Sequence, residues 1–108
     1  SYSDREARMI IEVTDGRCRL VAAGNFRALK ITSPRSLSQA ALVSALAGVG
    51  SLVSQTDALI NPDALRRLAG PGVGADWNVK FDTMLRQAGT SGWIDEASGA
   101  IKVHVELV

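Results

Sequence analysis

The side chains that could perform acid–base or nucleophilic chemistry are few in this chain of 108 residues. His104 is the only histidine and Cys18 the only cysteine, and Asp95 and Glu96 are the carboxylates that a turn could bring towards His104. A general acid–base site requires such groups within hydrogen-bonding distance inside a pocket. Carboxylates in a turn are typically solvated, and His104 alternates with apolar residues towards the outer face of a strand. The sequence therefore indicates no catalytic centre, and an enzyme is only a third hypothesis.

Motifs for metals, disulfides and cofactors are also missing from the sequence. A single cysteine excludes an intrachain disulfide and every multi-cysteine metal site, and a single histidine removes most histidine-based centres. The glycine-rich run at 70–74 follows a short predicted helix, and no Gly-Lys-Ser/Thr element closes it. It therefore does not have the form of a phosphate-binding loop. We expect no metal and no cofactor.

Basic residues are unevenly distributed along the chain. The net charge is +1, but residues 1–36 contain seven basic and four acidic residues, whereas residues 37–108 contain five basic and seven acidic ones. Arginine and lysine bind phosphate oxygens, so the cations of the first third are candidates for contact with nucleic acid. The competing explanation is that these charges lie on the solvated face of a half-buried sheet.

The first third of the chain is predicted to form a three-stranded antiparallel meander. Asp15-Gly16 and Gly24-Asn25 are dipeptides that supply the positive φ angles of two-residue hairpin turns. Both separate runs with the composition of strands. The three strands are expected near 7–14, 17–23 and 26–32.

The register imposed by these turns predicts one apolar face. Val13 is expected opposite Cys18, and Ile11 opposite Leu20. The second turn places Leu20 opposite Leu29, and a slip of one residue would turn this face to solvent. Cys18 is expected to behave there as a small inert apolar side chain. The opposite face carries the candidate phosphate-binding residues Arg17, Arg19 and Lys30.

Residues 37–53 are predicted to form a helix without basic residues. Ser36 and Gln39 have the spacing of a capping box, and apolar residues recur every three to four positions. The absence of charge favours either burial in the core or docking onto a partner chain. Docking would make the protein a homodimer or an accessory subunit of a larger assembly. The residues of this possible partner interface are Leu42, Leu46, Val49 and Val53.

Two more helices are expected in the middle of the chain. Asn61-Pro62 is a favourable helix start, and Gly70 ends this short helix. A second, amphipathic helix is predicted near 76–88, with Gly89 just after its end. An ion pair between Asp82 and Arg86 is expected on its outer side. The polar side of this helix carries the candidate nucleic-acid-binding residues Asn78, Lys80 and Arg86.

The C-terminal residues are predicted to form a β-hairpin. Residues 101–107 alternate between apolar and polar, and Ser98-Gly99 supports a turn back towards Trp93-Ile94. The order of elements over 36–108 resembles a winged helix-turn-helix. This resemblance implies that Lys102 or His104 approaches a backbone phosphate and that a DNA groove is faced by Asn78, Lys80, Thr83, Arg86 and Gln87.

The chain as a whole is predicted to be one α+β domain over residues 1–108, with a meander, a layer of three helices and a C-terminal hairpin. Its composition, 46% hydrophobic and 21% charged, is that of a folded protein. No membrane-spanning stretch or signal peptide is visible in it, so a cytoplasmic location is expected. The first functional hypothesis is a non-catalytic module that binds nucleic acid through the basic sheet face or the winged-helix-like surface, including Lys102. The alternative is an accessory or oligomerising subunit that docks through the helix at 37–53.

Overall fold

The computed structural model describes residues 9–21, 23–26 and 28–108. Its strands are β1 (Met9–Thr14), β2 (Arg17–Val21), β3 (Leu29–Ser33), β4 (Gly50–Leu52), β5 (Asp57–Ile60) and β6 (Ile101–Leu107). Its helices are α2 (Gln39–Ala45), α3 (Pro62–Ala69) and α4 (Gly74–Thr90), with a 3₁₀ turn, η1 (Pro71–Val73), between the last two.

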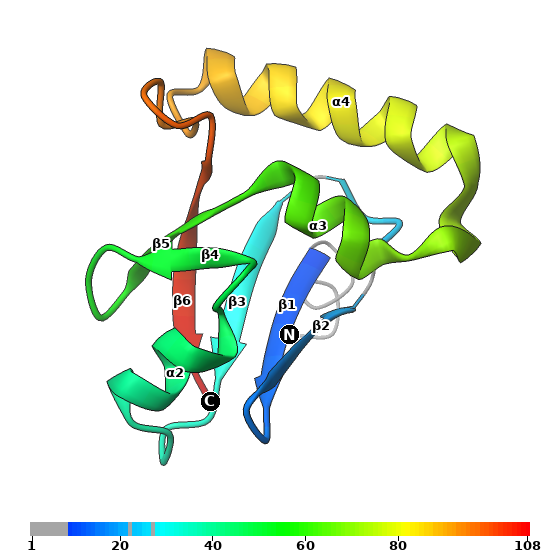
Figure 1. The fold of residues 1–108 in the computed structure, drawn as a ribbon. Coiled ribbons are helices and arrows are strands. Elements are labelled where there is room, and N and C mark those ends of the chain that lie inside the picture. The colour runs from blue at the N-terminus through cyan, green and yellow to red at the C-terminus, as the bar shows by residue number, and fades with distance from the viewer. Residues whose placement is uncertain (1–8, 22, 27) are drawn as a thin grey trace.

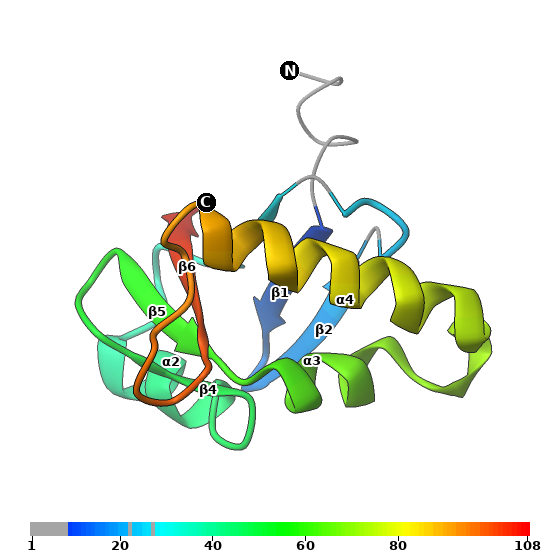
Figure 2. The ribbon, with the colours of Figure 1, turned by 90° about the horizontal axis from the view of Figure 1, so that it is seen from above.

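These elements form an α+β domain built on one mixed six-stranded sheet. The strand order is β2-β1-β3-β6-β5-β4. Helices α2 and α3 lie on one face of the sheet, and α4 lies across the end at which β1, β3 and β6 begin (Figures 1 and 2). None of the helices in the described part of the chain has the length and apolar character needed to cross a membrane.

The first predicted hairpin is confirmed. Asp15 and Gly16 adopt φ angles of 49° and 76°, as a two-residue turn of this kind requires. The register places Ile11 opposite Leu20 and Val13 opposite Cys18. The next apolar pair that this turn predicts, Met9 opposite Ala22, includes a residue outside the described part of the chain. The local turn signal and the apolar alternation were therefore sufficient to determine this hairpin.

The predicted antiparallel meander is wrong at its third strand. β3 does not pair with β2; it lies on the other side of β1 and runs parallel to it, with Ile11 opposite Ile31. Leu20 therefore does not face Leu29, and Gly24-Asn25 does not close a hairpin. The chain instead crosses the start of β1, where the Met9 N–H donates to the Ala28 carbonyl at 2.9 Å. This crossing makes β1 a central strand with a partner on each side.

The C-terminal strand is also central, so the predicted hairpin accounts for only a small part of its pairing. β6 pairs in parallel with β3, with Ile31 opposite Val105, and antiparallel with β5, with Ala58 opposite Val103. Of the expected hairpin, the structure has a short antiparallel arm: Ile94 bridges to Ile101, and the N–H groups of Lys102 and Asp95 donate to the carbonyls of Trp93 and Ala100, both at 2.8 Å. Alternation indicates a half-buried strand but does not identify its neighbours. The winged-helix-like order is not confirmed, because β4 and β5 separate α2 from α3.

The helix expected over 37–53 is much shorter than predicted. Ser38, not Ser36, caps α2, and its hydroxyl accepts from the Ala41 N–H at 3.1 Å. The helix ends at Ala45, and Gly48 follows with a φ of 82°, which stops further helical turns. The chain then enters β4, which pairs antiparallel with β5. These two strands were missed because they are short and are joined by a polar run without alternation.

The positions of helices α3 and α4 agree better with those predicted from the sequence. The Asn61 side chain caps α3 by accepting from the N–H groups of Asp63 and Ala64 at 2.8 and 3.3 Å. Gly70 ends α3 as predicted. α4 is longer than predicted, because it begins at Gly74 and continues through Gly89 to Thr90. Its buried side chains are those of the predicted apolar stripe: Trp77, Phe81, Met84 and Ala88.

The pairing of β4 with β5 predicts a severe effect of a methyl group at Gly50. A Cβ there would overlap the Leu59 carbonyl oxygen and lie 2.8 Å from Ile60 Cδ1. We expect Gly50→Ala to lower the free energy of unfolding by about 1–3 kcal/mol, because a well-packed site must shift to admit it. Urea denaturation measures this loss. Gly72→Ala is the control, since no atom lies within 4 Å of its Cβ, and an equal loss in both variants would contradict the argument.

Candidate nucleic-acid interface

The cations predicted on the sheet are present there, but two of the three are paired. Arg19 lies opposite Glu12 in the register, and its Nε donates to Glu12 Oε1 at 3.0 Å. Lys30 Nζ donates to Glu106 Oε1 at 3.1 Å, and only 15% of the lysine side chain is exposed. Arg17 is exposed in the edge strand β2. This face therefore alternates positive and negative charges instead of presenting a continuous basic surface.

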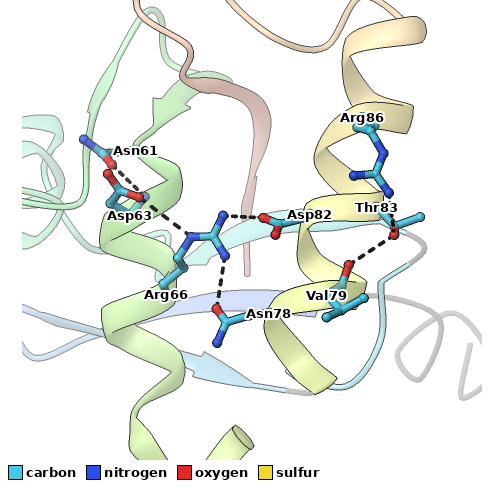
Figure 3. Close-up of polar contacts among 8 residues, drawn as sticks. All are labelled: Asn61, Asp63, Arg66, Asn78, Val79, Asp82, Thr83 and Arg86. Atoms are coloured by element: carbon cyan, nitrogen blue, oxygen red, sulfur yellow. Dashed lines mark hydrogen bonds and ion pairs between the residues drawn. The ribbon is translucent and has the colours of Figure 1, made fainter. Parts of the chain in front are cut away.

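The junction of α3 and α4 is organised by the guanidinium group of Arg66 (Figure 3). Its two terminal nitrogens donate to Asn78 Oδ1 at 3.1 Å and to Asp82 Oδ1 at 2.6 Å. Its Nε lies 3.7 Å from Asp63 Oδ1, and its Cζ lies 4.8 Å from the centre of the Phe81 ring. Asn78, a predicted nucleic-acid contact, is thus held by Arg66. Asp82 pairs with Arg66, so the ion pair expected with Arg86 is wrong.

Arg86 makes a local contact on the outer side of α4 (Figure 3). Its guanidinium donates to Thr83 Oγ1 at 3.1 Å, and the Thr83 hydroxyl donates to the Val79 carbonyl at 3.1 Å. The Arg86 side chain remains exposed. Its positive charge is therefore available at the surface of α4, without a carboxylate partner among the described residues.

An aromatic cluster fixes α4 against the chain that connects β2 and β3. Trp77 Nε1 donates to the Ala23 carbonyl at 2.7 Å. The Trp77 ring stacks on Phe81 with centroids 4.9 Å apart, and it meets Phe26 in a tilted arrangement at 5.7 Å. Contacts of this kind stabilise beyond the area they bury. They place Phe26 next to α4, where it lines an open groove.

We call this hollow the α4 groove; it consists of two adjoining pockets with volumes of about 170 and 270 Å³. The two pockets share Phe26, Met84 and Gln87, so they follow one another along α4. The lining residues come from α4, from the segment that follows it, from the end of the connection into β3 with the first residue of β3, and from the start of β6. These residues are Phe26, Ala28, Leu29, Val79, Lys80, Thr83, Met84, Gln87, Ala88, Ser91, Trp93, Ile101 and Lys102.

The charge of the α4 groove is positive. Lys80 and Lys102 line it, and none of its described lining residues is acidic. Among the carboxylates that the sequence places near α4, Asp82 pairs with Arg66. Asp95 accepts from the N–H and hydroxyl groups of Ser98, at 3.1 and 2.6 Å. The fold thus brings together two of the seven predicted nucleic-acid-binding residues, from α4 and β6, in one concave surface.

The residues predicted as a partner interface lie mostly in the core. Leu42, Leu46 and Val49 are 5%, 0% and 9% exposed and belong to the main hydrophobic cluster. Val53 is 64% exposed and lies outside α2. Burial therefore explains the apolar character of these three positions, whereas most other residues of 37–53 are exposed or half-buried. Three of the four side chains are not on the surface of the monomer.

None of the titratable groups considered for catalysis lines the groove. His104 lies in the sheet between Lys30 and Asp57, on an exposed face. Cys18 is half-buried, and desolvation raises the pKa of its thiol above the ordinary value. In the described part of the chain, no three His, Cys, Asp or Glu residues are grouped so that they could hold a metal ion.

The aromatic residues of the groove were not identified from the sequence. Trp93 is 53% exposed, although it was predicted as part of a hairpin strand. Phe26 was expected to begin the third strand of the meander. An exposed tryptophan has no signature in a single sequence, and the position of Phe26 depends on the crossing between β2 and β3. No protein-family model, curated protein or solved structure matches this chain. Its function is therefore argued from the groove itself.

The Arg66 contacts predict that this residue stabilises the junction of α3 and α4. We expect Arg66→Met to lower the free energy of unfolding by about 1–2 kcal/mol, because charge-assisted hydrogen bonds and a cation–π contact are lost while the aliphatic stem is kept. Arg66→Lys should recover only part of the loss, because an ammonium group cannot reproduce the planar fork.

Chemical denaturation measures both Arg66 variants against Arg67→Met, which removes an exposed arginine from the same helix. The control should change stability by no more than about 0.5 kcal/mol. Equal stability of wild type and Arg66→Met would contradict the role given to Arg66.

Proposed function

We propose that this chain is a non-catalytic module that binds nucleic acid in the α4 groove. The observation that carries the proposal is the joint placement of Lys80 and Lys102 in a concave surface whose described lining has no carboxylate. Lysine side chains bind phosphate oxygens as point charges. A polyanion is attracted by such a surface, whereas the alternating charges of the sheet face attract and repel it in turn.

The dimensions of the groove support an extended ligand. Its lining residues on α4 run from Val79 to Ala88, which corresponds to about 14 Å at roughly 1.5 Å per residue. This is the length of about four nucleotides stacked at about 3.4 Å each. Lys80 lines one of its pockets and Lys102 the other. The two lysines can thus contact separate phosphates of one strand.

The salt dependence of binding tests this proposal. We expect the affinity for an oligonucleotide to fall as salt is raised, because each phosphate contact releases a counterion. Replacing both Lys80 and Lys102 by Gln should reduce the slope of log K against log salt by about 1.4 for a single strand, or about 0.7 per contact. Fluorescence anisotropy of a labelled oligonucleotide at several salt concentrations measures the slope.

The matched control replaces Arg17 and Arg19, on the sheet, by Gln. This variant also removes two positive charges, so it corrects for the change in net charge. It should alter the slope by less than the groove variant. The absence of binding at low salt would refute the proposed function, and a larger effect of the sheet variant would assign binding to the sheet.

A second candidate function is that of an accessory subunit that docks through the surface around α2. A third pocket, of about 250 Å³, is lined by four leucines and two glutamines: Leu37, Gln39, Leu42, Leu52, Gln55 and Leu107. Leu107 is 44% exposed there. An apolar hollow at the surface favours contact with another protein.

This second candidate predicts self-association or capture by a larger protein. If the chain associates with itself through this pocket, light scattering should give a mass above that of one chain, and Leu107→Asp should restore the monomer by placing a charge in the interface. Thr90→Asp, at the exposed end of α4, should leave the assembly unchanged. A monomeric wild type would contradict the self-associating form of this candidate.

A further inference from the structure

Trp93 exposes its ring beside the α4 groove although its backbone is firmly held. Its N–H donates to the Ala88 carbonyl at 2.8 Å, and its carbonyl accepts from the Lys102 N–H at 2.8 Å. The residue is nevertheless 53% exposed and lines the first pocket. The fold thus presents a large aromatic surface at a fixed place, immediately next to a lysine that lines the same pocket.

The first pocket has the size and chemistry to receive one planar ring. Its volume is about 170 Å³, and an apolar protein cavity of roughly 150 Å³ admits benzene. Phe26 and Met84 supply apolar contacts, while Gln87 supplies an amide that can donate to and accept from the edge of a base. An indole, an apolar wall, an amide and an ammonium group are therefore collected in one concavity.

We infer that this pocket takes an unpaired base that stacks on Trp93, so that the nucleic acid bound by the module is single-stranded. The inference rests on the proposed function and specifies its ligand. Proteins that bind single strands combine cations that follow the backbone with aromatic rings on which bases stack. In a duplex the same base is paired and stacked within the helix, and a side chain reaches its face only if the base is flipped out.

The test compares one oligonucleotide in two states. A labelled DNA strand of about 12 nucleotides, longer than the groove, is titrated with the full chain as a single strand and after annealing to its complement. We expect the single strand to bind at least about tenfold more tightly. Tryptophan fluorescence should be quenched by the single strand, because a base stacks on the exposed indole. An abasic strand of equal length keeps the phosphates, and it should bind no better than the duplex.

Variants of Trp93 separate stacking from charge. Trp93→Leu should weaken binding of the single strand by about five- to 150-fold and abolish the quenching, while the affinity for the duplex stays unchanged. Trp93→Tyr should restore much of the affinity, because it keeps an aromatic ring. Val53→Ser, which removes another exposed apolar side chain, is the matched control and should bind as the wild type does. Trp77 remains in every variant as an internal reference for folding.

The possible outcomes distinguish the inference from the proposed function. If single strand and duplex bind equally and Trp93→Leu changes neither, the inference is overturned. The proposed function still stands in that case, provided that the Lys80 and Lys102 variant weakens both complexes. If neither nucleic acid binds at low salt, the proposed function fails and the inference fails with it. A preference for the single strand that survives Trp93→Leu would also overturn the stacking role of Trp93.

Discussion

The contact between Trp77 and the segment that connects β2 to β3 links the sheet to α4. The indole donates to the Ala23 carbonyl and packs between Phe26 and Phe81. It thereby joins residues more than fifty positions apart in the chain. The crossing from β2 to β3 passes the start of β1, where the Met9 N–H donates to the Ala28 carbonyl, and Trp77 of α4 contacts this crossing at Ala23. This aromatic cluster is compatible both with the parallel pairing of β1 and β3 and with the position of α4. One of its residues, Phe26, also lines the α4 groove.

The distribution of charge follows from which side chains find partners in the folded chain. On the sheet, Glu12 and Glu106 pair with Arg19 and Lys30. On the helices, Arg66 forms an ion pair with Asp82. Surface ion pairs of this kind contribute little stability individually, but they reduce the field that a charged ligand experiences. The α4 groove differs because its described lining contains lysines without carboxylates, and this contrast is the reason for proposing it as the surface that binds a polyanion.

Local signals in the sequence predicted several local elements correctly, although the Gly24-Asn25 turn and the Ser36 cap were wrong. The Asp15-Gly16 turn, the first hairpin register, the Asn61 cap and the buried stripe of α4 all depend on residues close to one another in the chain. Strand neighbours could not be predicted in this way. Parallel pairs such as β1 with β3 have no turn dipeptide that marks them, and the alternation of β6 is equally compatible with a hairpin and with a central strand. The candidate site depends on these long-range pairings, because Lys102 reaches the groove only through the position of β6.

The sequence by itself determined that this protein is an α+β domain, which of its apolar residues alternate towards the core, where its first hairpin turns, and where the helix capped by Asn61 begins. These properties depend on backbone preferences and hydrophobic periodicity, which act over a few residues. Only the tertiary structure decided which strands are neighbours, which cations are neutralised, and that Trp93 and Lys102 lie side by side at a concave surface. These features arise from contacts between distant segments, whose free energy depends on the packing of the whole chain.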